Sequence, residues 1–223
     1  MSPPQPVDLA TVARRVVDLY PGASRFARGY VGGKLRGDPV TPAVLALATA
    51  TPFGAVVDLG CGRGQLGLAL LTAGLATRLD GLDCDAAKIG DASAAASGLA
   101  ARFTVADLAT APIPACDTVL LIDVLYQLRA AAQCALLGRI AAAARRRVVI
   151  RAFDPARGWR AHLGLAMERA GRAVRRDATA IEPLPLAVVA APFEAAGFLV
   201  STSPCWGRTP LPNVLLIADR PAT

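Results

Sequence analysis

The sequence is poor in the side chains that usually bind metals or form disulfide bonds. One histidine, His162, occurs among 223 residues, and the five cysteines include no C-x-x-C pair. Structural zinc sites and disulfide-rich folds need such residues at short, repeated spacings. We therefore expect no metal site and no disulfide framework, and we interpret the cysteines as reduced, small, buried residues. They are Cys61, Cys84, Cys116, Cys134 and Cys205.

Long apolar segments are also missing. The longest apolar run is interrupted by Asp123 and is shorter than the ~20 residues that a membrane-spanning helix needs. The N-terminal region has prolines but no apolar stretch of the signal-peptide kind. With 54% hydrophobic residues, the chain can bury one full core. We expect a single cytoplasmic domain over residues 1–223.

Lysine is nearly absent, although the chain is basic. Lys34 and Lys88 are the only lysines, and arginine supplies the other cations behind a net charge of +7. The two arginine clusters, Arg145–Arg147 and Arg172–Arg176, have no interleaved aromatic residues of the kind that stack on bases. We interpret both clusters as solvated faces, so nucleic acid is not the expected partner.

A glycine-rich turn directly follows a short apolar segment. Val56–Asp58 predicts a strand, glycines follow at 60, 62 and 64, and Gln65–Ala73 predicts a helix. Glycine accepts positive φ and has no Cβ, so such a turn lets a ligand approach the backbone and the N-terminus of the helix. A dinucleotide-binding turn, G-x-G-x-x-G, would have glycine where Gln65 stands, so a nicotinamide cofactor is disfavoured.

Acidic residues follow the next predicted strands at regular intervals. Asp83 ends the segment 78–83, Asp107 follows 102–105, and Asp123 follows 117–122. In an open α/β sheet, ligands bind outside the carboxyl ends of the strands. A carboxylate at Asp83 suits the two hydroxyl groups of a ribose; its alternative role is to cap the helix that starts near Asp85.

These segments together resemble the class I S-adenosylmethionine (SAM) methyltransferases over about residues 54–220. Asp58–Gly64 is similar to the glycine motif of that family, and Asp117–Leu128 is similar to its fourth strand and the following turn. The resemblance implies that the turn holds the methionine part of SAM, while Asp83 holds the ribose and Asp107 bonds the adenine. The expected cofactor-binding residues are Asp58, Gly60, Cys61, Gly62, Gly64, Asp83, Cys84, Asp107, Leu108, Asp123 and Lys34.

The resemblance also implies an α/β fold, a Rossmann-like seven-stranded mixed sheet with helices on both faces. The remaining strands are predicted at 147–152, 198–203 and 213–218. Because a short loop joins the last two, the final strand should run antiparallel. The order that the resemblance implies is 3-2-1-4-5-7-6. Within residues 1–45, a helix at Val7–Tyr20 and a glycine-rich lid should precede the core, and an insertion at about 153–192 should follow the fifth strand.

Three segments can reach the transferred methyl group, because an acceptor must approach the carboxyl ends of the strands. The first is the glycine-rich segment around Tyr30 and Lys34, which forms either a lid or a flexible surface loop. If it forms a lid, Lys34 can pair with the carboxylate of SAM. The second segment is the turn after Asp123, where Tyr126 either faces the acceptor or fills the core.

The third segment comprises the loops after the fifth and sixth strands. Its tryptophans, Trp159 and Trp206, are candidate walls for an apolar or aromatic acceptor. His162 is the one side chain ready to act as a base at neutral pH, although a lone histidine is more often structural. The candidate catalytic residues are His162, Tyr126 and Tyr30, and the candidate substrate residues are Tyr30, Tyr126, Trp159 and Trp206.

Motifs that are missing after the fourth strand narrow the choice of acceptor. Nucleic-acid amino methyltransferases of this fold carry Asn/Asp-Pro-Pro-Tyr/Phe where this chain has Asp123–Tyr126. Cys134 lies in an alanine-rich segment and does not fit the nucleophile of RNA cytosine enzymes. The predicted acceptor is a small molecule, an aromatic or polyketide/acyl-type metabolite.

Three short phrases, at 33–40, 158–159 and 208–216, resemble a bacterial group of small methyltransferases from aryl-polyene, pigment and related secondary-metabolism clusters. Two alternatives stay open: an RNA methyltransferase, and a SAM-binding regulatory protein without catalysis. The oligomeric state, monomer or homodimer, is also open.

Overall fold

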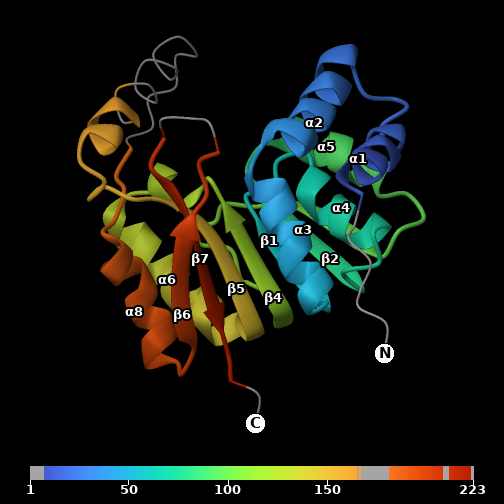
Figure 1. Cartoon of the computed structure of the whole chain (residues 1–223). Helices are drawn as coiled ribbons and strands as arrows, with labels where there is room; N and C mark the ends of the chain where they lie inside the picture. Colours follow the sequence, from blue (N-terminus) through green and yellow to red (C-terminus); the bar gives the residue numbers. More distant parts are fainter. Residues whose placement is uncertain (1–7, 165, 167–180, 208–210, 222–223) are drawn as a thin grey trace.

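A computed structural model describes residues 8–164, 166, 181–207 and 211–221. A seven-stranded sheet runs through the molecule, and helices cover both of its faces (Figure 1). The strand order is β3-β2-β1-β4-β5-β7-β6. β7 pairs antiparallel with both β5 and β6, whereas the other neighbouring strands are parallel. The predicted fold class and strand order are confirmed.

The strands lie close to their predicted positions and differ mainly at their ends. β5 begins three residues earlier than predicted, because Ala144 pairs with Cys116 across an irregularity in the β4–β5 register. β3 ends two residues before Asp107, so this acid belongs to the following loop. The bounds are β1 Ala55–Leu59, β2 Arg78–Asp83, β3 Ala101–Val105, β4 Cys116–Ile122, β5 Ala144–Phe153, β6 Leu199–Pro204 and β7 Asn213–Asp219.

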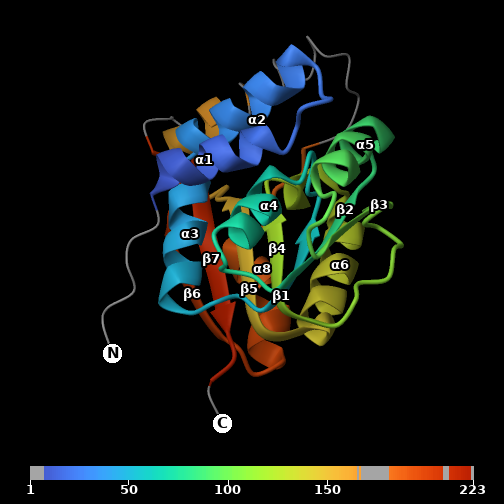
Figure 2. The same cartoon turned by 90° about the vertical axis from the view of Figure 1, so that its right-hand side faces the viewer.

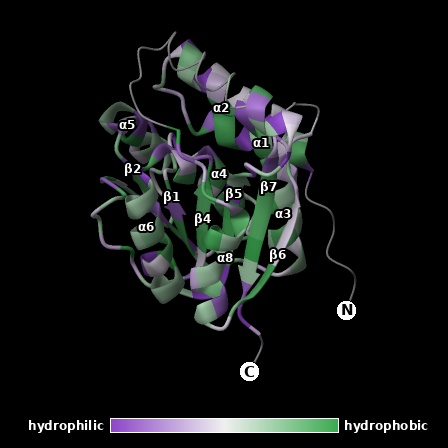
Figure 3. Ribbon diagram, turned by 90° about the vertical axis from the view of Figure 1, so that its left-hand side faces the viewer, coloured by the Kyte–Doolittle hydropathy of each residue, from purple (hydrophilic) through white to green (hydrophobic). Residues whose placement is uncertain are grey.

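Two hydrophobic cores, one on each face, hold the helices to the sheet. Val56 faces the core beneath the N-terminal helices, and Val57 faces the core on the other side. Because both faces are covered, the central strands are apolar along their length (Figure 3). The first core lies under α1 (Leu9–Asp18), α3 (Val40–Ala50), α4 (Gln65–Thr72) and α5 (Ala86–Ala95), and the second under α6 (Ala130–Ala143) and α8 (Leu186–Ala195).

The N-terminal region is more helical than the sequence predicted. The segment with four glycines is a helix, α2 (Arg25–Gly37), rather than a surface loop. The Ser24 side chain caps it by accepting a hydrogen bond from the Ala27 N–H. Figure 2 shows α1 and α2 packed side by side over α4. α1 spans Leu9–Asp18, shorter than the predicted Val7–Tyr20.

The predicted insertion at 153–192 is described only in part. Residues 159–164 are helical, and α8 begins at Leu186. Residues 165 and 167–180, which include the cluster Arg172–Arg176, lie outside the described residues. Within the described ranges, no helix is both long enough and apolar enough to cross a membrane.

Candidate active site

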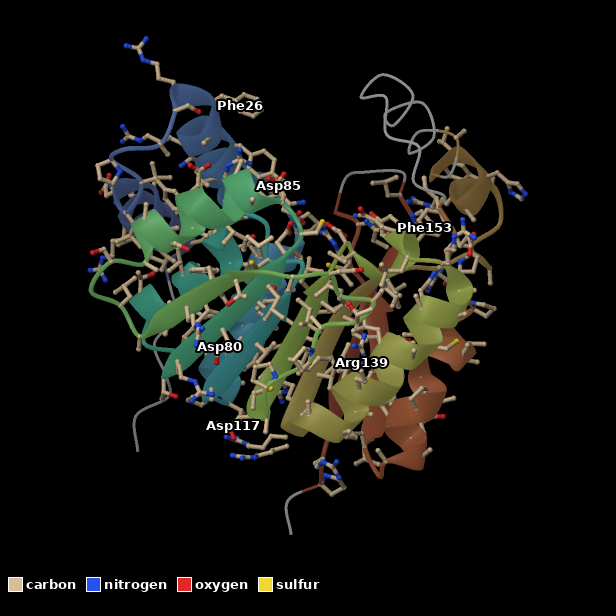
Figure 4. All side chains as sticks on the ribbon, turned by 180° about the vertical axis from the view of Figure 1, so that it is seen from behind. Phe26, Asp80, Asp85, Asp117, Arg139 and Phe153 are labelled. Carbon is tan, nitrogen blue, oxygen red and sulfur yellow. The ribbon has the colours of Figure 1, made fainter. Side chains whose placement is uncertain are left out.

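The carboxyl ends of β1, β2 and β4 meet at one edge of the sheet, beside a cavity of about 430 Å³. Figure 4 shows Asp85, which follows β2, and Phe153, which ends β5, toward this edge, and Asp117 at the opposite end of the sheet. α2, the glycine turn and the residues after β2, β3 and β4 supply the wall. Every predicted cofactor-binding residue except Gly64 lines this cavity.

The three glycines of the turn have different roles, although all adopt positive φ. A Cβ on Gly60 would lie 2.2 Å from Val124 Cγ2, and one on Gly64 would lie 2.5 Å from Phe103 Cζ. A Cβ on Gly62 would meet nothing within 4 Å. Gly60 and Gly64 are therefore needed for packing, whereas Gly62 leaves open space at the wall of the cavity.

Asp83 holds the glycine turn against the next helix. Its Oδ2 accepts a hydrogen bond from the Gly62 N–H at 2.8 Å, and its Oδ1 accepts one from the Asp85 N–H at 2.9 Å. The side chain that caps α5 is that of Asp85, which accepts from Ala87 and Lys88. The N-cap alternative for Asp83 is therefore wrong. A carboxylate has about four lone-pair sites, so Asp83 can still accept bonds from a ligand.

Asp58 is a buried acid at the end of β1, with 3% of its surface exposed. Burial, together with the charge of Asp83, raises the pKa of Asp58 to about 7. Nearby, Gln65 Oε1 is buried without a hydrogen-bond partner in the described part of the chain. Because both side chains line the cavity, this wall offers hydrogen-bond acceptors to a cationic or donor group.

Four charged side chains form an ion network beside the cavity: Lys34, Asp38, Asp123 and Arg151. Asp38 and Arg151 are buried, whereas Lys34 and Asp123 are partly exposed and line the cavity. The Arg151 guanidinium bonds both carboxylates, with Nη2 2.9 Å from Asp38 Oδ2 and Nε 2.5 Å from Asp123 Oδ1. Lys34 Nζ lies 2.5 Å from Asp38 Oδ2 and 3.4 Å from Asp123 Oδ2. Two cations and two carboxylates thus neutralise one another.

The pKa values of Asp38, Lys34 and Arg151 agree with charged side chains. Burial alone would raise the pKa of Asp38, but hydrogen bonds and charge from Arg151, with those from Lys34, lower it to about 2. Burial would lower the pKa of Lys34 and of Arg151, but the two carboxylates raise both. Asp38, Lys34 and Arg151 therefore stay charged around neutral pH.

A second cavity, of about 500 Å³, adjoins the first. Both cavities are lined by Tyr30, Lys34 and Asp123, so these three residues form the boundary between them. The second cavity is lined further by Gly33, Gly37, Asp38, Pro39, Tyr126, Arg151, Cys205, Leu211 and Asn213.

The structure brings together some of the predicted acceptor-side residues and separates others. Tyr30 lines both cavities, and Tyr126, in the 3₁₀ turn Leu125–Gln127, lines the second with its ring 6.3 Å from that of Phe153. Trp159, His162 and Trp206 line neither of these two cavities.

Those three side chains have other surroundings. Trp159 is 66% exposed. His162 is exposed, with Nδ1 3.0 Å from the Gly158 carbonyl oxygen. The ring of Trp206 lies 5.1 Å from the Arg157 guanidinium carbon.

Sequence reasoning missed Asp38 and Arg151. A signal was present for Arg151, since an arginine inside the apolar strand Val148–Phe153 must find a buried partner. Asp38 gave no comparable signal, because an acid beside a proline also fits an exposed turn.

Residues 56–147 match the family model described as a methyltransferase domain. The chain carries a methyltransferase domain. Together with the sheet order, this match confirms the predicted recognition, a class I SAM-dependent methyltransferase, and with it the predicted enzyme class and cofactor. No curated protein sequence matches the chain.

Solved structures resemble the methyltransferase in fold. Magnesium protoporphyrin IX methyltransferase from Synechocystis PCC 6803, with bound S-adenosylhomocysteine (SAH), is 22% identical with a TM-score of 0.64, covering 96% of this chain and 100% of that one. A SAM-dependent methyltransferase from Mesorhizobium loti is 16% identical with a TM-score of 0.66, covering 83% and 99%. The pyocyanin biosynthetic protein PhzM is 22% identical with a TM-score of 0.60, covering 91% and 60%.

Proposed function

We propose that this methyltransferase transfers the methyl group of SAM to a small-molecule acceptor, an aromatic or polyketide/acyl-type metabolite. The supporting observation is the pair of adjoining cavities with Tyr30, Lys34 and Asp123 at their boundary. One cavity has the glycine turn and the acids that suit SAM, and the other has room for a second ligand. Methyl transfer needs two ligands that meet at such a boundary.

On the cofactor side, each part of SAM has a chemically suitable partner. The Lys34–Asp123 pair presents one cation and one anion, which match the carboxylate and ammonium of an amino acid. Asp58 and the glycine turn line the same cavity. We assign Asp83 to the ribose, and Cys84, Asp107 and Leu108 to the adenine.

On the acceptor side, Tyr30 and Tyr126 offer aromatic surfaces for a flat ligand. Gly33 and Gly37 keep this cavity wide, because a Cβ on either residue would meet nothing within 4 Å. The charges in the wall are already paired with one another. An acceptor that is uncharged where it meets Arg151 therefore fits best.

The chemistry required of these residues is modest. When bound, SAM supplies a sulfonium methyl group that is already activated for transfer. The chain orients the acceptor by the walls of the second cavity. Where an acceptor must lose a proton, the Tyr30 hydroxyl is the best-placed of the three candidate groups, because Tyr30 alone lines both cavities and His162 lines neither of them.

Calorimetric titration with SAH, and in parallel with NADH, tests the cofactor assignment. We expect micromolar binding of SAH, none of NADH, and loss of SAH binding in Asp83→Ala. Asp80→Ala is the matched control, because Asp80 lies on the same strand and pairs with Arg78 outside the cavity. Failure of the folded, ligand-free native protein to bind SAH would contradict the proposal.

An acceptor screen follows, with release of SAH as the readout. Phenolic and polyene acids are the first compounds, and RNA is included at several salt concentrations. Turnover of a small aromatic or acyl compound supports the proposal. Turnover of RNA with a steep dependence on salt would instead favour the RNA alternative, and SAH binding without turnover of any compound would favour a regulatory protein.

A further inference from the structure

We call the first cavity, with the glycine turn, the cofactor cavity, and the second the acceptor cavity. Two members of the ion network, Asp38 and Arg151, line the acceptor cavity but not the cofactor cavity. The other two, Lys34 and Asp123, line both. The network therefore connects residues that can touch SAM with residues that lie behind them. Any role that Asp38 and Arg151 have in SAM binding must therefore act through Lys34 and Asp123.

We propose that Arg151 and Asp38 are positioning residues, which hold Lys34 and Asp123 in the arrangement that binds the amino-acid end of SAM. The inference rests on the proposed function. It assigns a role in cofactor recognition to two residues that do not line the cofactor cavity. Arg151 lies on β5 beside Ile122, so β4 stands between it and β1, which leads into the glycine turn.

The Arg151 guanidinium has the shape that this role requires. It is planar and presents N–H groups on two edges, so it can bond two carboxylates at fixed angles. Here it bonds Asp38 and Asp123 with two hydrogen bonds each. With 4% of its surface exposed, Arg151 has no alternative rotamer in water. The Asp123 carboxylate is thereby fixed in direction as well as in position.

Asp38 holds Lys34 in position, as Arg151 does for Asp123. It directly follows α2, and its Oδ1 also accepts a hydrogen bond from the Val40 N–H at 3.0 Å, which fixes it at the start of α3. Its Oδ2 receives both Arg151 Nη2 and Lys34 Nζ. Asp38 therefore joins the C-terminal end of α2, which carries Lys34, to the central sheet.

Asp123 needs such support because its backbone is strained. It has φ of +62°, and within the described residues it is the one non-glycine residue with positive φ. Such a conformation costs about 1–3 kcal/mol and persists only where the surroundings impose it. Here Gln127 Nε2 donates to the Asp123 carbonyl oxygen at 2.5 Å, and Arg151 holds the carboxylate. The strain directs the side chain to the boundary between the cavities.

Stability alone is a weak explanation for the network. Buried ion pairs gain little net free energy after desolvation, and apolar replacements of both partners are often neutral. If Arg151 and Asp38 served only to stabilise the fold, an uncharged pair would replace them without any selective effect on ligand binding. That difference allows the two roles to be separated.

The test compares two ligands, SAH and 5′-methylthioadenosine, which lacks the amino-acid end. In Arg151→Met, and in the double variant Arg151→Met/Asp38→Asn, we expect the Kd for SAH to rise at least tenfold. The Kd for 5′-methylthioadenosine should stay within twofold of the native value. Arg151→Lys should recover only part of the SAH affinity, because a lysine cannot bond two carboxylates as a planar fork.

Arg147→Met is the matched control, since Arg147 lies on the same strand and pairs with Asp219 at 2.6 Å without lining either cavity. Both of its Kd values should be unchanged. The double variant leaves no unpaired charge, so it covers the case in which the single variant does not fold. Equal changes for the two ligands, unchanged SAH affinity, or unfolding of both Arg151→Met variants would overturn the proposal. If native protein does not bind SAH, the proposed function fails instead.

Discussion

The cofactor cavity and the acceptor cavity are built in different ways. The glycine turn and Asp83 lie within 24 consecutive residues, 60 to 83, and the turn is held by its own backbone N–H groups, which donate to Leu82 and to Asp83. The acceptor cavity takes Tyr30 from α2, Tyr126 from the turn after β4, Arg151 from β5 and Asn213 from β7. The contiguous part of the cofactor cavity can be recognised in a sequence, whereas a cavity assembled from distant side chains depends on the complete fold.

The largest effect is expected from a substitution in the glycine turn of the cofactor cavity. Gly62→Val should weaken SAH binding at least 100-fold, because the new side chain would enter open space at the cavity wall. Gly74→Val is the control. Gly74 has φ of +71° and open surroundings but lies after α4, outside the cavity. Calorimetry should show unchanged SAH binding there, although both variants lose about 1–2 kcal/mol of stability from strain.

A second prediction concerns the protonation of Asp58. Its raised pKa, about 7, means that it is largely neutral at pH 6 in the free protein. A bound ammonium group favours the carboxylate, so SAH binding should release a proton and strengthen about tenfold from pH 6 to pH 8. Calorimetry in buffers of different ionisation enthalpy measures the released proton. Asp58→Asn should abolish it, and release that persists in this variant would assign the proton to another group.

The same group affects stability with a defined sign. Between about pH 4 and pH 7, folded Asp58 keeps a proton that the unfolded chain has lost, so the free energy of unfolding should decrease as the pH rises. Well above pH 7 Asp58 has lost its proton in both states, so its contribution to the free energy of unfolding no longer changes with pH. Urea unfolding at pH 5 and at pH 7 should show a smaller decrease in Asp58→Asn than in native protein.

A smaller effect is expected in the acceptor cavity, whose residues come from distant parts of the chain. Tyr126→Ala should raise the KM of an aromatic acceptor about fivefold, which corresponds to the ~1 kcal/mol of one aromatic contact. The Kd for SAH should not change, because Tyr126 lines the acceptor cavity and not the cofactor cavity. A change in SAH affinity without a change in KM would show that the two cavities are not divided as proposed.

The smallest effects are expected at Trp159 and His162. Both are exposed and line neither of the two cavities. Trp159→Ala and His162→Ala should alter SAH affinity and turnover less than twofold. A tenfold loss of turnover in either variant would show that the substituted residue belongs to the acceptor site, as the sequence alone suggested.

The fold was predictable because its determinants are local and repeated. Apolar strands, each followed by an acid or a glycine turn, mark β1 to β4, and a short loop before β7 indicates the antiparallel end. The order of the strands came from the resemblance to the methyltransferase family and is the observed one. Asp83 was predictable for the same reason, since it follows the turn at the spacing of a βαβ unit.

The ion network was not predictable, because its members lie at positions 34, 38, 123 and 151. Trp159 shows a different difficulty. An aromatic residue in the right loop can still point into solvent, since the loop determines its neighbourhood and not its direction. α2 was misjudged for a related reason: its glycines suggested a loop, but packing against α1 and α4 maintains a helix.

Those glycines also have a consequence for hydrogen exchange. α2 contains Gly29, Gly32, Gly33 and Gly37, and a glycine inside a helix costs about 1 kcal/mol relative to alanine. Local opening should therefore require less free energy in α2 than in α4, and its amides should exchange sooner. Since α2 carries Tyr30 and Lys34, a ligand that contacts them should slow this exchange. Hydrogen exchange of the α2 amides, measured with and without SAH, would therefore report contact between the ligand and this helix.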